Sequence, residues 1–111
     1  MNYNNKKFKP LHSSDNAEAS EETIFHYRQE GAILTSEYQG GKIVKGHLIG
    51  IVDQHGTIDM RYHQVNTEGV LMTGKCMSRP EMDADGKIRL FESWQWTSGD
   101  RSEGKSILVE L

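Results

Sequence analysis

The sequence contains few of the residues that staple or interrupt small domains. It has one cysteine, Cys76, and two prolines among 111 residues. A single cysteine excludes an internal disulfide, so a hydrophobic core must supply the stability, as is usual in a reducing compartment. We therefore expect a cytoplasmic protein. The length fits one domain, because domains cluster near roughly 100 to 150 residues.

Long hydrophobic runs and an excess of positive charge are also absent. The longest apolar-leaning stretch, Ile43–Val52, is interrupted by Lys45 and His47, and it is far shorter than the ~20 residues of a membrane-spanning helix. Residues Met1–Phe8 lack the apolar segment of a secretory signal. The net charge of -3 offers nucleic acid no general attraction. We expect neither a membrane nor a nucleic-acid partner.

The first 21 residues differ in composition from the rest of the chain. They are mostly polar, with Tyr3, Phe8 and Leu11 as the large apolar side chains. We interpret residues 1–21 as a polar N-terminal arm with a short strand at Phe8–His12, and residues 22–111 as the barrel domain. The segment Ser13–Glu22 has the composition of a loop, and we expect it to be the least ordered part of the chain.

Short runs of β-branched, aromatic and long residues fill the remainder, and glycine-containing turns separate them. No run sustains the spacing of an amphipathic helix. Together with the strand in the arm they predict eight strands, which tight turns would make antiparallel. The seven runs are Glu22–Gln29, Ala32–Gln39, Ile43–Val52, Thr57–Asn66, Val70–Ser78, Lys87–Thr97 and Lys105–Leu111.

The expected fold class is all-β, a single antiparallel up-and-down barrel of about eight strands, calycin-like or lipocalin-like. Closure of the meander removes its exposed edges, and eight strands enclose just enough space for side chains or one small ligand. An open sandwich of two small sheets is the alternative.

Strand alternation predicts which side chains share the interior, because residues i, i+2 and i+4 lie on one face of a sheet. Three runs place an aromatic set opposite a polar set. The inward set forms aromatic walls with a few polar groups, the usual composition of a small-molecule pocket. The candidate ligand-binding residues are Phe25, Tyr27, Gln29, Tyr62, Gln64, Glu92, Trp94 and Trp96.

Glu92 stands out in this set because it is an acid among aromatic side chains. Desolvation would raise its pKa. If a reaction occurs in the interior, Glu92 is the candidate catalytic acid or base. Arg61 or Arg89 could pair with it only if the alternation fails. The competing interpretation is that these bulky side chains simply fill a solid barrel.

The sequence predicts no metal site and no cofactor. Its five histidines lack the spacing of a metal-binding pair on one strand or helix. The phosphate-binding loop, nucleophile-elbow and dinucleotide fingerprints are missing. We interpret Asp83–Gly86 as a hairpin turn rather than a calcium loop, and Cys76 as a small buried hydrophobe.

Several segments together resemble a family of small bacterial proteins, and the resemblance spans nearly the whole chain. They are Thr23–Gln29, Tyr38–Gly41, Gly46–Gly50, Met60–Gln64, Thr73–Cys76 and Arg89–Thr97. Members of that family are commonly labelled N-acetylglutamate synthase. The resemblance implies a calycin-like or avidin-like β-barrel, and the label implies a synthase activity.

Three classes of function remain open at this point. The first is an uncharacterised barrel that holds a small, partly apolar ligand. The second is an enzyme that uses the same pocket with Glu92 as acid or base. The third is an interaction module with a filled barrel, whose partner would meet an outer face with His26, Arg28, Arg61 and His63. A homodimer would also cover any sheet edge left by incomplete closure.

Overall fold

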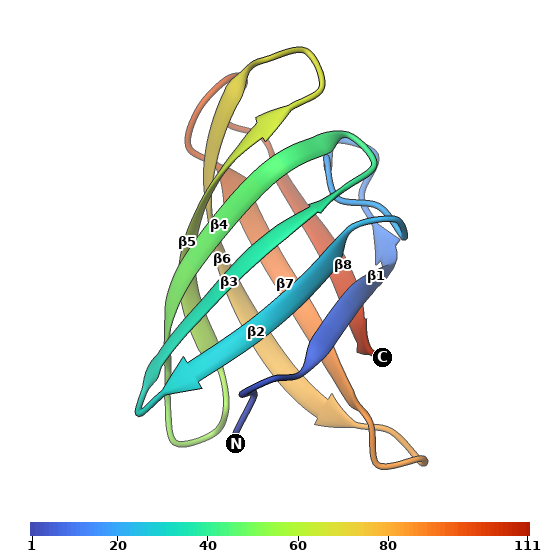
Figure 1. The fold of residues 1–111 in the computed structure, drawn as a ribbon, viewed down its shortest axis with the longest axis vertical. Coiled ribbons are helices and arrows are strands. Elements are labelled where there is room, and N and C mark those ends of the chain that lie inside the picture. The colour runs from blue at the N-terminus through green and yellow to red at the C-terminus, as the bar shows by residue number, and fades with distance from the viewer.

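The computed structural model describes residues 1–111 and contains eight strands and no helix (Figure 1). The structure therefore contains no helix that is long and apolar enough to cross a membrane. The strands are β1 (Lys7–Ser13), β2 (Ile24–Glu30), β3 (Ile33–Gly40), β4 (Ile43–Val52), β5 (Ile58–Asn66), β6 (Leu71–Met82), β7 (Ile88–Trp96) and β8 (Glu103–Glu110).

The strands form a closed barrel in which each one pairs with the next along the chain. All eight pairings are antiparallel, and β1 closes the barrel by pairing with both β2 and β8. Phe8 shows this closure, because it lies opposite Phe25 on one side and Glu110 on the other. The expected all-β, up-and-down barrel is confirmed, and the open sandwich is excluded.

Three hairpin turns are built in the same way, by one short polar side chain that accepts two backbone N–H groups. Asp53 Oδ1 accepts from His55 and Thr57. Asn66 does the same for the amides two and four residues ahead, and so does Asp83. The third residue after the accepting side chain in each turn is a glycine with positive φ, such as Gly86 at 76°, a conformation that glycine adopts without steric strain. The segment Asp83–Gly86 is thus a hairpin turn, as predicted.

Two strands differ from the sequence prediction at their prolines. Strand β6 was expected to end at Ser78, but it continues through Pro80, which lies opposite Leu90, to Met82. Loss of one N–H does not end the pairing, because the facing strand β7 supplies a partner for the other backbone groups. In β1 the register shifts between Pro10 and His12, and this bulge leaves Leu11 exposed.

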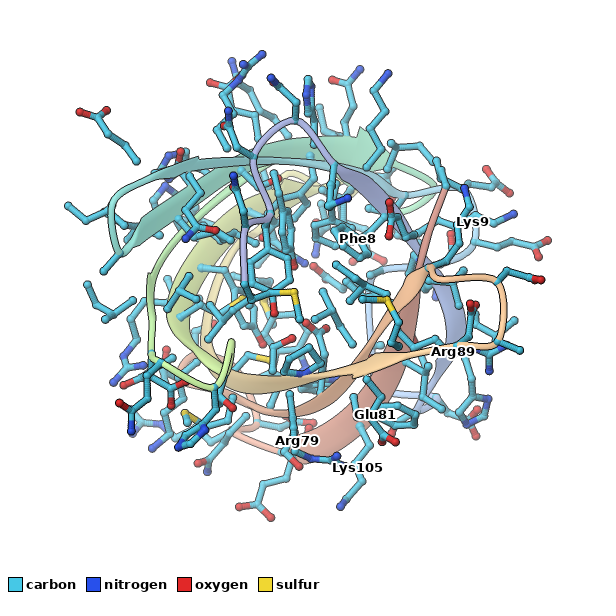
Figure 2. The ribbon with its side chains drawn as sticks, turned by 90° about the horizontal axis from the view of Figure 1, so that it is seen from below. Phe8, Lys9, Arg79, Glu81, Arg89 and Lys105 are labelled. Carbon is cyan, nitrogen blue, oxygen red and sulfur yellow. The ribbon has the colours of Figure 1, made fainter.

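The N-terminal residues close one end of the barrel. Tyr3 is fully buried, its hydroxyl donates to the carbonyl of Gly56, and its ring meets Phe8 and Tyr27 edge-on or nearly so, with ring centroids 6.3 and 6.1 Å away. Figure 2 looks along the barrel and shows Phe8 directed inward while the next residue, Lys9, points outward. The polar arm therefore contributes both a strand and a plug to the hydrophobic core.

Candidate ligand-binding cavity

A cavity of about 60 Å³ lies inside the barrel, beyond the plug formed by Tyr3. A water molecule needs roughly 10–15 Å³ by this measure, so the space equals that of about four to six waters. Every strand from β2 to β8 contributes to its wall, and the loop between β1 and β2 covers its mouth. The lining residues are Ala17, Glu18, Ala19, Phe25, Tyr27, Tyr38, Leu48, Met60, Tyr62, Gln64, Cys76, Glu92, Trp94, Trp96, Ser106 and Leu108.

Seven of the eight residues selected from the sequence meet in this cavity. They are Phe25, Tyr27, Tyr62, Gln64, Glu92, Trp94 and Trp96. The eighth, Gln29, does not line it. Its side chain accepts from the Tyr3 amide and donates to the carbonyls of Met1 and Gly31. Strand β2 runs past the end of the cavity. The alternation that directs Phe25 and Tyr27 into the cavity therefore directs Gln29 toward the N-terminal plug instead.

Aromatic rings form most of the wall and are fixed by their neighbours. The rings of Trp94 and Trp96 lie edge-to-face with centroids 5.6 Å apart, and Tyr62 meets Trp96 at 5.8 Å. The Trp94 indole N–H donates to Ser106 Oγ at 2.9 Å, and the Trp96 indole N–H donates to the carbonyl of Asn16 at 3.1 Å. These bonds satisfy both buried indoles, so the rings stand as pre-formed apolar walls.

Three of these aromatic residues lie directly opposite a glycine on the following strand. The pairs are Tyr38 with Gly46, Tyr62 with Gly74, and Trp94 with Gly104. A Cβ added at any of the three glycines would overlap the facing ring. Each ring therefore lies flat over its neighbouring strand, which keeps the centre of the barrel from being filled.

Glu92 lies inside the barrel and has no cationic partner. Burial raises the pKa of its carboxyl to about 7, and the Ser78 hydroxyl opposes that shift in part. Ser78 faces Glu92 across the β6–β7 pairing, although the two side chains do not form a hydrogen bond of full geometry. Arg61 pairs instead with Asp59 on the outer face at 2.6 Å, and Arg89 approaches Asp83 at 4.0 Å. The predicted alternation therefore holds along β7.

Two other buried groups near Glu92 lack partners. The hydroxyls of Tyr27 and Ser78 are buried and make no hydrogen bond of full geometry, although such groups are nearly always satisfied in folded proteins. The nearby Cys76 thiol is buried, and desolvation raises its pKa well above the usual value. Cys76 is thus a buried thiol rather than a reactive thiolate, as the sequence indicated.

The mouth loop, residues 14–23, is held across the open end by several hydrogen bonds, and the Glu18 carboxylate makes two of them. Glu18 accepts from the side-chain amides of Gln64 and Asn66, each at 2.8 Å. Gln64 in turn accepts from the Tyr38 hydroxyl at 2.8 Å. Sequence reasoning missed this loop because a polar loop has no periodicity. It also missed Tyr38, although the alternation of β3 and the pairing of Tyr38 with Phe25 both indicate that Tyr38 points into the barrel.

The histidines lie outside the cavity, and no three His, Cys, Asp or Glu side chains converge on a common point. His47 and His63 face each other across the β4–β5 pairing with ring centroids 5.5 Å apart. His63 is exposed and His26 is half-buried, on the outer face to which the alternation assigned both.

Comparison with known proteins identifies one match. A family model described as avidin-like protein matches residues 1–111, the whole chain. No curated protein and no solved structure matches the chain.

Proposed function

The chain belongs to the avidin-like family, and from that premise we propose that it binds a small, partly apolar molecule in the cavity of its barrel. The fold is a calycin-type barrel, consistent with small-molecule binding. The ligand would lie among Tyr62, Trp94 and Trp96, with Gln64 and Glu92 as the polar groups that orient it. Binding sites of this kind combine apolar walls with a few convergent polar groups.

One observation supports this proposal above the others: buried polar groups without partners border the empty space. Tyr27 has an unbonded hydroxyl and Glu92 an unpaired carboxyl, and both residues line the cavity. A barrel interior that serves only for packing would gain stability by replacing such groups with apolar ones. A ligand that bonds to them explains why they are there.

The alternative functions have less support. An enzyme would use the same cavity with Glu92 as acid or base, since a pKa of about 7 suits proton transfer at neutral pH. The family match supports the barrel but gives no support to an N-acetylglutamate synthase activity. A solid barrel that acts only through its outer face leaves the cavity and its unpaired groups without a role.

A thermal-shift screen of the purified protein tests the proposal. The panel contains small amines, alcohols, carboxylic acids and amino acids including glutamate, together with acetyl-CoA, flavins and fatty acids. A ligand present at a hundred times its Kd adds about 2.7 kcal/mol to the stability of the folded state. We expect at least one compound to raise the Tm. No shift across the panel would contradict the proposal.

Two variants on strand β7 locate the bound compound. Trp94 lines the cavity, whereas Phe91 lies on the outer face, where the Arg79 guanidinium sits 5.3 Å from its ring centroid. Trp94→Phe should therefore weaken binding, and Phe91→Leu, which shortens an aromatic residue on the outer face of the same strand, should leave it unchanged. Equal effects of the two variants would place the ligand outside the cavity.

A further inference from the structure

We infer that the ligand of this cavity carries a protonated amine on a small apolar body, with the ammonium group bound by the Glu92 carboxylate. This inference rests on the proposed function and adds the chemical class of the ligand to it. It is drawn from the charge, the hydrogen-bonding groups and the rings that surround the space.

The charge of the cavity is of one sign. Its sixteen lining residues include two acids, Glu18 and Glu92, and no Lys, Arg or His. Glu18 at the mouth already accepts hydrogen bonds from Gln64 and Asn66. Glu92, deeper in the barrel, is left without a cationic partner. A buried carboxylate needs a cation or several donors to stay ionised, and in this barrel only a ligand can supply the cation.

The groups that face Glu92 are all neutral at pH 7. They come from five strands: Tyr27 of β2, Tyr38 of β3, Tyr62 of β5, Cys76 with Ser78 of β6, and Ser106 of β8. Burial raises the pKa of each of these tyrosines and of the cysteine further above neutrality. None of them can balance the charge of the carboxylate.

The hydrogen-bonding inventory also fits an ammonium group. A primary ammonium has three N–H donors and no acceptor. Near Glu92, the Tyr27 hydroxyl is buried, makes no hydrogen bond and belongs to a residue that lines the cavity, and its oxygen has lone pairs that can accept. A carboxylate ligand would bring only acceptors to a site whose strongest group is itself an acceptor, and it would meet the negative charge of Glu92.

The aromatic walls favour the same charge. The face of an indole or phenol ring carries negative potential, so a cation over Trp or Tyr is attracted, most strongly over Trp. Trp94, Trp96 and Tyr62 line the cavity, and both indoles direct their N–H groups to protein oxygens. The rings would contact the apolar body of the ligand and also stabilise its positive head.

The cost of dehydration does not cancel this attraction. A buried ion pair often gains little, because both ions lose their water. Here the Glu92 carboxyl is already largely buried inside the barrel in the free protein, and this burial raises its pKa to about 7, so most of the dehydration on binding is that of the ligand. Because the ammonium binds the ionised carboxylate, affinity should rise with pH through about 7. With a pKa of about 7, the ionised fraction increases nearly tenfold between pH 6 and pH 8.

Two matched sets of probes test the inference by isothermal titration calorimetry. Benzylamine, benzyl alcohol and benzoate share one shape, and isobutylamine with isobutanol is a smaller pair. Both amines are protonated from pH 6 to pH 8. We expect at least one amine to bind about tenfold more tightly than its alcohol at pH 8. The affinity of that amine should fall several-fold at pH 6. Benzoate should bind more weakly than either benzylamine or benzyl alcohol.

Glu92→Gln is the decisive variant, because it keeps the shape and removes the charge. It should abolish the advantage of the amine and its pH dependence, and it should leave the alcohol within about twofold of its wild-type affinity. Glu21→Gln, an exposed acid outside the cavity, is the matched control and should change nothing.

The outcomes separate this inference from the proposed function. An alcohol or benzoate that binds as tightly as the amine would overturn the inference and leave the binding function intact. The same holds if no amine binds while another compound of the wider screen does. If no compound of any class binds, both are wrong.

Discussion

The ring of Tyr62 on β5 occupies the space that a side chain at position 74 of β6 would need. Tyr62 and Gly74 are direct partners in the β5–β6 pairing, and a Cβ at position 74 would overlap the phenol ring. Tyr38 with Gly46 and Trp94 with Gly104 repeat the arrangement. A ring laid over a glycine in this way stays close to the wall, which is how a narrow barrel with so many aromatic residues retains a central space.

Substitution at Gly74 tests this relationship. Gly74→Ala should destabilise the protein by about 1–3 kcal/mol, because overpacking forces the Tyr62 ring out of its position. Urea unfolding monitored by tryptophan fluorescence measures the change. The Tyr62→Ala variant provides the control background. With the ring removed, the methyl group that Gly74→Ala adds should destabilise the protein clearly less. Equal costs in both backgrounds would show that the ring is not what excludes a side chain at position 74.

The stability of the protein should depend on pH through Glu92. Burial raises its folded-state pKa from 4.5 to about 7, so the folded protein binds this proton more tightly than the unfolded chain does. The stability that this proton provides is complete below pH 4.5 and is lost as pH rises through about 7. By pH 8 the ionised carboxyl costs the fold up to about 3 kcal/mol relative to low pH.

Comparison of wild type with Glu92→Gln isolates this effect. The variant cannot ionise at position 92, so its advantage in unfolding free energy should grow from pH 5 to pH 8. Urea unfolding of both proteins at both pH values measures how the difference in unfolding free energy between them changes with pH. The contributions of other titrating groups cancel in this comparison. A constant difference between the two proteins would mean that Glu92 is not held in a dehydrated environment.

The mouth loop should loosen when Glu18 is removed. Glu18→Ala deletes the acceptor of the Gln64 and Asn66 amides, at an expected cost of about 2 kcal/mol. Hydrogen exchange of the backbone amides in residues 14–23 should accelerate, while the strands on the far side of the barrel keep their protection. Glu21→Ala in the same loop, an exposed residue, serves as the control. Unchanged exchange in Glu18→Ala would contradict the role of this carboxylate in holding the loop.

The sequence alone predicted the barrel and seven of the sixteen residues that line the cavity, because both follow from local rules. Glycine turns marked the strand ends, and alternation directed Tyr62 and Trp94 inward without any knowledge of their partners. The same rule assigned Gln29 to the interior, since alternation has no information on where along a strand the cavity ends. That boundary depends on Tyr3, a residue far away in the sequence that fills the end of the barrel.

The remaining site features depend on contacts between distant segments. The polar segment that contains Glu18 has the composition of a loop, and only its hydrogen bonds to distant residues, such as those of Glu18 with Gln64 and Asn66, place it over the mouth. The extension of β6 through Pro80 likewise depends on a facing strand that continues to pair. Local composition carries no signal for either, because both are tertiary effects.

The central claim, that the cavity binds the ligand, is tested most directly by the two indole N–H resonances in a two-dimensional ¹H–¹⁵N NMR spectrum. Trp94 and Trp96 are the only tryptophans of the chain, both line the cavity, and each indole N–H is hydrogen-bonded at its wall or mouth. Titration with a compound that raises the Tm should move both indole peaks in a saturable way with one Kd. Movement of outer-face amides alone, with both indole peaks unchanged at saturation, would contradict the account.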